Sequence, residues 1–299
     1  MKVVLFCGGF GTRIREFPEP VPKPMITIGY RPILWHIMKY YAHHGHKDFI
    51  LCLGYRADAV KNYFLNYDEC VSNNFVLSGG GSELKLLSSD MDDWNITFVD
   101  TGVYSNLGQR LMAVRPYLEG ESMFLANYSD GVTDLPLASY IEHFTARDKV
   151  GSFLAVTPSH SCHVVSVDGD VAKGIQPITK SGLLINGGFF AFREEIFDYM
   201  QEGEELVEEP FQRLIRQEQL IAYKYDGYWA CMDTFKDRQQ LDDLFSRGCA
   251  PWEVWKTADR TLPESSLEES KSEPKRQTVG THSAKCADHV LPKRVHVGG

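Results

Sequence analysis

The residues best suited to chemistry stand near the start of this 299-residue chain, in Gly8-Gly9-Phe10-Gly11-Thr12-Arg13 and a little further on at Lys23. Glycines let backbone N–H groups approach a phosphate closely, because no Cβ stands in the way. Thr12 adds a hydroxyl donor, and Arg13 and Lys23 add positive charge at neutral pH. We therefore interpret the stretch as a polyphosphate-binding loop. The alternative is a plain strand-to-helix turn with an incidental arginine, since short motifs also arise by chance.

Two aspartates that follow apolar runs are candidate metal ligands. Asp130 comes after the predicted strand 122–127. Open α/β sheets bind ligands at the carboxyl ends of their strands, so a Mg²⁺ ion would meet a triphosphate there. A tight turn is the alternative for this aspartate. Asp233 stands where a predicted strand leads into a helix, and both an N-cap role and a metal-ligand role are open for it. Asp134 is a nearby alternative ligand, although we expect it to cap a helix that begins near Leu135.

Two further positions suit the binding of a ligand. Gly108-Gln109-Arg110-Leu111 is predicted to begin a helix. Arg110 would then lie near the N-terminus of that helix, which is a second place for the phosphate or base of a nucleotide. Asn186 and Gly187 join a polar, backbone-accessible point to an apolar strand. Such a point suits the hydroxyl groups of a ligand, and a β-bulge would use the same glycine.

The elements that must position these residues alternate between short apolar runs and amphipathic stretches. The run 3–7 is a predicted buried strand that feeds the glycine-rich loop. Residues 32–41 are predicted to form a helix that begins at a proline and is ended by Gly45. The alternation continues with a strand at 49–54, a helix at 57–67 and a strand at 96–100. This order is typical of an α/β fold with a parallel sheet.

The second half of the chain is predicted to add a β-rich insertion and further α/β elements. We expect strands at 152–157, 164–167, 171–176, 183–192 and 220–223, and helices at 194–200 and 210–217. Ser78-Gly79-Gly80-Gly81-Ser82 is interpreted as a flexible turn or lid. Residues 1–256 are expected to form one domain. Residues 257–299 are rich in Ser, Glu, Lys and Pro, which is typical of a disordered tail.

Composition restricts the class of partner. The net charge of −9 argues against nucleic acid, which requires a basic face. No apolar run has the length of a membrane span and residues 1–20 lack a signal-peptide pattern, so we expect no membrane partner. The seven cysteines are widely spaced without a C-x-x-C pair, which favours buried free thiols in a reducing cytoplasm. His36 lies in a predicted helix, and we expect it to be packed or on the surface rather than catalytic.

Seven stretches together resemble the sugar-1-phosphate nucleotidyltransferase family, and most closely its glucose-1-phosphate cytidylyltransferases. They occur in the family's order and at suitable intervals over residues 1–256. The stretches are Gly8-Gly9-Phe10-Gly11-Thr12-Arg13, Pro22-Lys23-Pro24-Met25, Pro32-Ile33-Leu34-Trp35-His36-Ile37-Met38, Asp130-Gly131-Val132, Ile185-Asn186-Gly187-Gly188-Phe189-Phe190, Met232-Asp233-Thr234 and Ala250-Pro251-Trp252. Any one of them is a weak signal, and the set is a strong one.

This resemblance implies a fold and one reaction. The fold is a Rossmann-like mixed, mostly parallel sheet flanked by helices, with the β-rich insertion on the acceptor side. In the reaction, an oxygen of a sugar 1-phosphate attacks the α-phosphate of a nucleoside triphosphate, and pyrophosphate leaves. CTP and glucose 1-phosphate are the implied substrates, Mg²⁺ the implied cofactor, and a homo-oligomer the implied assembly. Alignment and positive charge suffice for such a transfer, so no Ser/His/Asp relay is needed.

The resemblance also implies roles for particular residues. The triphosphate would be wrapped by Gly8, Gly9, Gly11, Thr12 and Arg13. Arg13 and Lys23 would be catalytic and would neutralise charge on the α-phosphate and the leaving group. The remaining roles are Mg²⁺ binding by Asp130 and Asp233, a nucleotide contact by Arg110, and acceptor binding by Asn186, Gly187 and Lys180.

The chain departs from the family's pattern mainly on the acceptor side. The family has Phe-x-Glu-Lys-Pro after its hairpin, whereas this chain has Ile175-Gln176-Pro177-Ile178-Thr179-Lys180, with the lysine displaced by two residues. One alternative is therefore transfer to another phosphate or phosphonate acceptor. A second is an inactive, regulatory protein that binds nucleotide or sugar phosphate. A third, an NAD-dependent oxidoreductase, is disfavoured because the loop lacks the third glycine of G-x-G-x-x-G.

Overall fold

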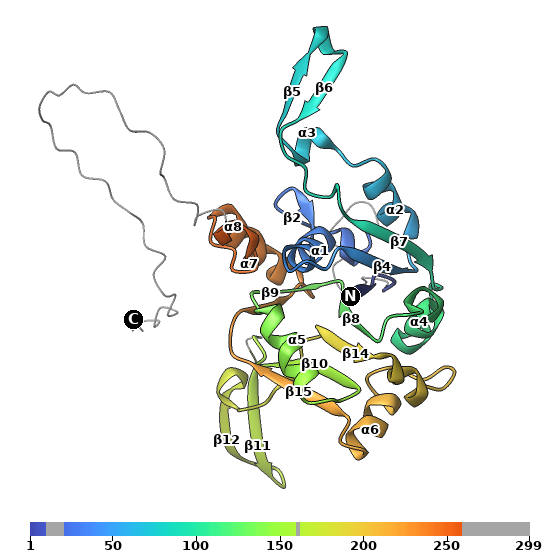
Figure 1. The fold of residues 1–299 in the computed structure, drawn as a ribbon. Coiled ribbons are helices and arrows are strands. Elements are labelled where there is room, and N and C mark those ends of the chain that lie inside the picture. Colours follow the sequence, from blue (N-terminus) through green and yellow to red (C-terminus); the bar gives the residue numbers. More distant parts are fainter. Residues whose placement is uncertain (10–20, 160–161, 259–299) are drawn as a thin grey trace, which may run out of the picture.

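The structure is a computed structural model that describes residues 1–9, 21–159 and 162–258 (Figure 1). An eight-stranded sheet forms its centre, with the hydrogen-bonded order β13-β10-β14-β8-β1-β4-β7 and β15 also paired to β10. Its strands are β1 (Lys2–Phe6), β4 (Asp48–Leu53), β7 (Asn95–Asp100), β8 (Met123–Tyr128), β10 (Gly151–Val156), β13 (Ile185–Asn186), β14 (Phe190–Arg193) and β15 (Leu220–Tyr225).

The sheet is mixed and mostly parallel. β1 is parallel to both β4 and β8, β4 is parallel to β7, and β10 is parallel to β15. β14 runs antiparallel between β8 and β10, and β13 is antiparallel to β10. The predicted fold class is confirmed. The strongly apolar composition of β1 suits its central place, because a strand covered by helices on both faces needs no polar side.

Helices cover both faces of the sheet and bury two apolar clusters. Side chains alternate across a strand, so Val3 and Leu5 of β1 point into one cluster while Val4 and Phe6 point into the other. The first cluster packs against α1 (Ile33–His43), α2 (Ala57–Leu65), α5 (Leu137–Ala146) and α7 (Phe235–Ser246). The second packs against α4 (Leu107–Val114), the 3₁₀ turn η5 (Glu194–Tyr199) and α6 (Glu209–Arg216).

The two ends of α1 are set by a proline and a glycine, as predicted. α1 begins directly after Pro32, whose fixed φ and missing N–H suit a helix start. It ends where Gly45, at a φ of 85°, donates its N–H to the carbonyl of Ala42. That left-handed conformation is the usual reason for a glycine after a helix. His36 is buried inside α1, which is the packed one of the two positions left open for it.

Two predicted elements differ from the structure. The predicted strand 183–192 is broken into β13 and β14, because Gly188 and Phe189 both adopt positive φ, 76° and 49°. The break is fixed by the Asn127 side chain, which accepts the Phe189 N–H at 2.9 Å. The predicted helix 194–200 is the 3₁₀ turn η5, which runs from Glu194 to Tyr199.

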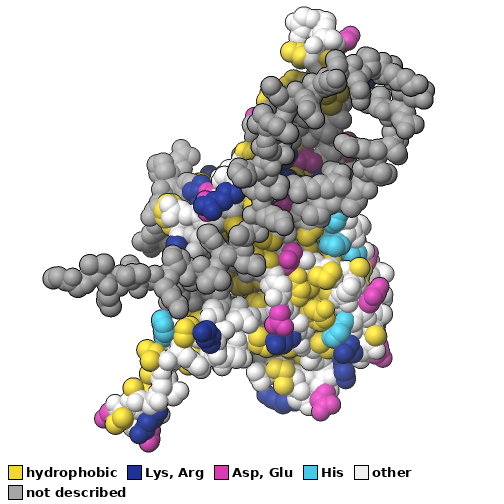
Figure 2. Space-filling model, turned by 90° about the vertical axis from the view of Figure 1, so that its left-hand side faces the viewer, with side chains coloured by type: hydrophobic (Ala, Val, Ile, Leu, Met, Phe, Trp, Pro, Cys, Tyr) yellow, Lys and Arg dark blue, Asp and Glu magenta, His cyan; other side chains and the backbone are white. Residues whose placement is uncertain are grey.

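Two hairpin arms project from the body (Figure 1). One joins β5 (Phe75–Ser78) to β6 (Glu83–Leu86) through the turn η2 (Gly79–Gly81), so the glycine run predicted as a turn or lid is the tip of a hairpin. The other pairs β11 (His163–Asp168) with β12 (Val171–Pro177). Figure 2 shows hydrophobic side chains exposed on both arms, which extend away from the rest of the molecule.

The remaining elements are short. They are α3 (Glu69–Ser72), α8 (Trp255–Ala258), η1 (Lys23–Met25), η3 (Arg115–Leu118), η4 (Ile178–Lys180), β2 (Thr27–Ile28), β3 (Arg31–Pro32), β9 (Gly131–Thr133) and β16 (Trp229–Cys231). α8 continues two residues past the predicted domain limit at 256, and the rest of the predicted tail lies outside the described residues. No helix in the described ranges is long and apolar enough to cross a membrane.

Candidate active site

Gly8 and Asp130 follow the two neighbouring strands at which the strand order of the sheet reverses. From β1 the chain order runs outward through β4 to β7 on one side and resumes at β8 on the other. Gly8 comes two residues after β1 ends, and Asp130 comes two residues after β8 ends. Open α/β sheets bind ligands at such a switch point, outside the carboxyl ends of the strands. The topology therefore places both predicted residues at the expected edge of the sheet.

A short antiparallel ladder brings Asp233 beside Asp130, although the two are far apart in the chain. β9 pairs with β16, and Gly131 is the register partner of Cys231. The ladder is extended by the Met232 N–H, which donates to the Asp130 carbonyl at 2.8 Å. Asp130 directly precedes β9 and Asp233 follows β16 by two residues, so the register of this ladder holds the two aspartates close together.

Lys23 joins the two aspartates directly. Its Nζ lies 2.6 Å from Oδ2 of Asp130 and 2.5 Å from Oδ1 of Asp233. Burial lowers the pKa of Lys23, but the charge of Asp130 and the hydrogen bonds to both carboxylates outweigh that effect and raise it above its usual value. The lysine is therefore a permanent cation at neutral pH. The structure brings together the three predicted residues Lys23, Asp130 and Asp233 from three separate segments.

Asp233 does not cap α7. The N-cap is Thr234, whose side chain accepts the Asp237 N–H while the Asp237 side chain accepts the Thr234 N–H. This is a capping box, in which each side chain satisfies the other residue's backbone donor. The N-cap alternative for Asp233 is therefore wrong by one residue, and its carboxylate points to Lys23 instead.

Asp134 is neither a helix cap nor a member of the Lys23 cluster. One of its carboxylate oxygens accepts hydrogen bonds from the Tyr225 hydroxyl at 2.5 Å and the Tyr228 N–H at 2.8 Å. α5 begins later than predicted, and its N-cap residue, Pro136, makes no side-chain cap. The expectation that Asp134 caps the helix is therefore wrong. Its role in the structure is to fasten the segment that leads into β16.

Cys231 contacts the same cluster through its thiol. Its Sγ lies 3.5 Å from Oδ2 of Asp233 and donates the S–H to that oxygen. Burial, followed by the charges of Asp233 and Asp130, raises the pKa of Cys231 to about 12. The group stays a neutral thiol at neutral pH. It is therefore a hydrogen-bond donor to Asp233 and not a thiolate nucleophile.

The Arg110 side chain binds the start of the loop that follows β1 and is not exposed to solvent. Its guanidinium donates to the carbonyls of Gly8 and Leu53 and to the Thr101 hydroxyl, at 3.1, 3.2 and 2.7 Å. Its side chain is buried, and a Cβ on Gly8 would lie 1.9 Å from one of its terminal nitrogens. The structure thus gives Gly8 a packing reason to be glycine. A direct contact of Arg110 with nucleotide stays a prediction.

The N-terminus of α4 is already satisfied by protein groups. The Asn106 side chain accepts the Gln109 N–H, and the Gln109 side chain accepts the Asn106 N–H. Glu205 accepts the Leu107 N–H at 3.3 Å. The idea that this helix end is a second phosphate site is not supported, because a carboxylate already stands there.

Asn186 and Gly187 form a rigid polar corner beside β8. The Asn186 amide donates to the Tyr128 hydroxyl at 3.2 Å, and its oxygen accepts the Gly188 N–H at 2.9 Å. The Gly187 carbonyl accepts the indole N–H of Trp229, and the Gly187 N–H donates to the carbonyl of Leu154. Gly187 is close-packed, since a Cβ there would lie 3.1 Å from Trp229 and Val156.

The remaining predicted residues are either apart from this cluster or outside the described residues. Lys180 is the exposed last residue of η4, and its side chain makes no hydrogen bond or ion pair with another residue that the structure describes. Gly9 is exposed. Gly11, Thr12 and Arg13 lie outside the described residues.

Sequence reasoning missed three contributors to the site. Tyr128 and Trp229 hold Asn186 and Gly187, and Thr234 takes the N-cap position of α7, so the Asp233 carboxylate does not cap that helix. The pattern Thr234-x-x-Asp237 carried a usable signal, because Ser or Thr followed three residues later by an acidic residue resembles a capping box. No comparable signal identified the two aromatic residues, since their partners come from distant segments.

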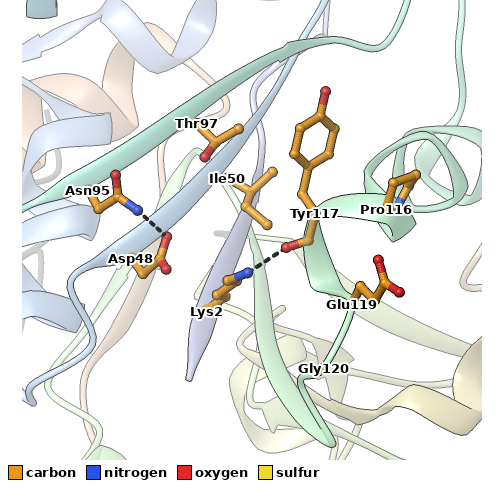
Figure 3. A pocket seen from close by; sticks show the side chains of 9 residues that line it. All are labelled: Lys2, Asp48, Ile50, Asn95, Thr97, Pro116, Tyr117, Glu119 and Gly120. Carbon is orange, nitrogen blue, oxygen red and sulfur yellow. Dashed lines mark hydrogen bonds between the residues drawn. The ribbon is translucent and has the colours of Figure 1, made fainter.

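A separate pocket lies at the opposite edge of the sheet (Figure 3). It has a volume of about 440 Å³ and is lined by Lys2, Asp48 and Asn95, the first residues of β1, β4 and β7. The Lys2 ammonium donates to the Tyr117 carbonyl at 2.7 Å, as the dashed line in Figure 3 shows. Since the carboxyl ends of the parallel strands lie at the other edge, this pocket is not part of the Lys23 cluster.

The Lys23 cluster fits a divalent cation bound together with phosphate. Two carboxylates converge on one positively charged atom, so the position already holds a cation in the form of the lysine ammonium. No group of three or more His, Cys, Asp or Glu residues suited to a metal ion occurs in the part of the chain that the structure describes. Mg²⁺ commonly takes one or two protein carboxylates and completes its shell with water and substrate phosphates. The donor set matches that pattern.

Comparison with known proteins gives consistent matches over most of the chain. A family model described as nucleotidyl transferase matches residues 2–237. Glucose-1-phosphate cytidylyltransferase of Salmonella typhi is 37% identical over 257 residues, covering 85% of this chain and 100% of that protein. A probable glucose-1-phosphate cytidylyltransferase of Bacillus subtilis is 34% identical over the same lengths. Among solved structures, UDP-glucose pyrophosphorylase complexed with UDP-glucose has a TM-score of 0.60 at 14% identity, covering 83% of this chain and 98% of that one.

Proposed function

Because the chain belongs to the nucleotidyl transferase family, we propose that it transfers a cytidylyl group from CTP to glucose 1-phosphate and releases pyrophosphate. The two full-length relatives named above carry that activity in their names. The observation that supports it most in the structure is the convergence of Lys23, Asp130 and Asp233 at the carboxyl ends of β1 and β8. A protein that only binds a sugar phosphate has no use for two convergent carboxylates.

The chemistry requires alignment and charge compensation rather than a relay of protons. The phosphate oxygen of the acceptor is already a nucleophile, and it attacks the α-phosphorus of CTP while the bond to the pyrophosphate oxygen breaks. Bound to Asp130 and Asp233, a divalent ion, which we propose is Mg²⁺, would offset negative charge on the phosphates. The Lys23 ammonium, which is close to both aspartates, is proposed to neutralise the α-phosphate and the leaving group. Arg13, which lies outside the described residues, is proposed for the same task.

The rest of the site is proposed to hold the two substrates. Gly8 and Gly9 begin the loop that would wrap the triphosphate, together with Gly11 and Thr12 outside the described residues. Arg110 supports that loop by fixing the Gly8 carbonyl. Asn186 and Gly187 are proposed to bind the sugar, with their orientation held by Tyr128 and Trp229. Lys180 is exposed and is the proposed partner of the acceptor phosphate.

A pyrophosphate-release assay tests the proposal. The protein is mixed with Mg²⁺ and each pair from CTP, UTP or dTTP and glucose 1-phosphate, another sugar 1-phosphate or a phosphonate. We expect the highest turnover with CTP and glucose 1-phosphate. A different best acceptor would follow from the altered stretch around Lys180, which is the observation that favours this second candidate. Release with none of the pairs would refute an enzymatic role.

We also propose that the protein is a cytoplasmic homo-oligomer. The exposed leucines and valines on the two arms support self-association, because projecting apolar hairpins are otherwise an aggregation hazard. The six cysteines among the described residues form no disulfide, which suits a reducing compartment. Light scattering of the purified protein measures the assembly, and fractionation of the source cells measures the location.

A further inference from the structure

One contact at the candidate site is not explained by substrate binding. In the proposed function Lys23 faces phosphate and the two aspartates face a divalent ion. In the structure these groups satisfy one another, with the ammonium 2.6 Å and 2.5 Å from one oxygen of each carboxylate. The side chains of Lys23, Asp130 and Asp233 are only 17%, 27% and 28% exposed, so solvent does little to replace these partners.

We propose that the Lys23 ammonium occupies the cation position of the nucleotide-free site, so that the metal ion enters only together with the triphosphate. This inference rests on the proposed function, because it concerns the order in which the same site is filled. It assigns Lys23 a second role beside phosphate neutralisation: the lysine is a positioning residue that keeps the two carboxylates together before the substrates arrive.

The geometry leaves room for one cation. Both short contacts end on the same nitrogen atom, so the two carboxylate oxygens face a single point. A Mg²⁺ ion that bridged these oxygens would need contacts of about 2.1 Å and would therefore overlap the ammonium. The metal ion and the lysine cannot both lie between Asp130 and Asp233, so binding of one requires displacement of the other.

The charge of the nucleotide explains why its binding would let the metal ion replace the Lys23 ammonium. Without a triphosphate, displacement of the lysine would take its partly buried ammonium away from the two anionic partners that it has among the described residues, which is unfavourable. A triphosphate supplies that partner, and its oxygens also supply metal ligands that the described residues lack. The lysine side chain is long enough to exchange carboxylate for phosphate without movement of the backbone. Metal binding should therefore depend on nucleotide.

The test measures binding of Mn²⁺ to the nucleotide-free protein by electron paramagnetic resonance, which reports free Mn²⁺ without any turnover. Lys23→Met removes the positive charge and keeps much of the length of the side chain. We expect it to bind Mn²⁺ at least about tenfold more tightly than the wild-type protein. Lys47→Met is the matched control, because Lys47 pairs with Asp93 away from this cluster. We expect no change in Mn²⁺ binding there.

Further variants decide the assignment. Adding Asp130→Asn to Lys23→Met should abolish the gained site, and Lys23→Arg should still exclude the ion. Lys23→Gln carries the same test if Lys23→Met does not fold, as judged by circular dichroism. Equal Mn²⁺ affinity in the wild-type and Lys23→Met proteins would overturn the inference.

The Mn²⁺-binding experiment and the pyrophosphate-release assay can fail independently of each other. Gained Mn²⁺ binding without pyrophosphate release from any substrate pair would refute the enzyme and leave the role of Lys23 standing. Pyrophosphate release together with unchanged Mn²⁺ binding in Lys23→Met would support the enzyme and refute the role of Lys23 as the occupant of the cation position.

Discussion

Asp233 and Thr234 are neighbours with different tasks. Thr234 begins α7 through its capping box with Asp237, whereas the Asp233 carboxylate contacts Lys23 and the Cys231 thiol. The chain thus separates helix initiation from site chemistry by one residue. Substitutions at the two positions should have different effects, which gives a matched pair of experiments.

Asp233→Asn should lower activity by roughly a hundredfold or more, because loss of one of the two carboxylates proposed to bind the metal ion would remove several kcal/mol of charge stabilisation. Its melting temperature should stay close to that of the wild-type protein. Thr234→Ala should do the opposite, costing about 1 kcal/mol of stability through the lost cap and leaving turnover largely intact. Pyrophosphate release and thermal unfolding measure the two effects. A large stability loss in Asp233→Asn with normal kinetics would contradict the assignment.

Gly8→Ala tests whether Arg110 fixes the loop. The new Cβ would stand 1.9 Å from the guanidinium, and Arg110 can move only by giving up its bonds to Gly8, Leu53 and Thr101. We expect a loss of about 1–3 kcal/mol in the free energy of unfolding, measured in urea. Gly9→Ala is the control, because a Cβ there meets nothing within 4 Å among the residues that the structure describes. Equal stability of both variants would show that Arg110 does not constrain Gly8.

At the residue scale, the sequence predicted the types of group but not all of their partners. Asp130 and Asp233 were identified by their positions after predicted strands, Lys23 by its charge shortly after the glycine-rich loop, and all three by resemblance. The structure places them in contact. Arg110 was expected at a ligand, yet it serves backbone carbonyls. A guanidinium has five donors that fit a phosphate or a set of carbonyls equally well, so composition alone does not decide between them.

At the scale of elements, the β9–β16 ladder and the break between β13 and β14 shape the site. The mostly parallel sheet follows from the alternating apolar runs, and that prediction was confirmed, whereas the order of its strands is known only from the structure. The interruption at Gly188 and Phe189 was not predicted, because the apolar pattern continues through it. It depends on Asn127 of a different strand accepting the Phe189 N–H. A local pattern carries no information about such a partner.

Also at the scale of elements, the exposed apolar side chains of the two hairpin arms predict self-association. Leu77 and Leu84 are register partners on the β5–β6 hairpin, 58% and 52% exposed. Replacing both by Glu should reduce the mass measured by light scattering to that of a smaller assembly. Leu65→Glu is the control, because Leu65 is 77% exposed on α2, away from the hairpin. An unchanged mass in the double variant, or a wild-type protein that is already monomeric, would refute a role for this arm.

At the scale of the whole molecule, one buried and two partly buried histidines should limit stability in acid. Burial lowers the pKa of His36 to about 4, and the pKa of His44 and of His46 also falls to about 4 for the same reason. His36 is held neutral, since its Nδ1 accepts from Trp252 and its Nε2 donates to the Ile28 carbonyl. In the unfolded chain these groups titrate near pH 6.5, so the unfolded state binds more protons between about pH 6.5 and 4.

The free energy of unfolding should therefore be constant above about pH 7 and fall as the pH drops from about 6.5 towards 4, with His36 alone contributing up to about 3 kcal/mol. Urea unfolding between pH 7.5 and 5 measures the slope, in a range where most carboxylates stay ionised. His36→Gln removes one of the three titrating groups and should make the slope smaller, with the contribution of His44 and His46 remaining. A slope that is the same in both proteins would show that His36 is not the cause.

The sequence separation between Lys23 and its two partners determines when the site can form during translation. Its partners lie 107 and 210 positions further along the chain. At about 5–20 residues per second, the ribosome needs on the order of 10–40 s between making Lys23 and making Asp233. The β1–β8 half of the sheet can form during that interval, while the second carboxylate is still missing. The centre is therefore completed late in translation, and a chain released before residue 233 would hold the first aspartate and the lysine without the partner that closes the site.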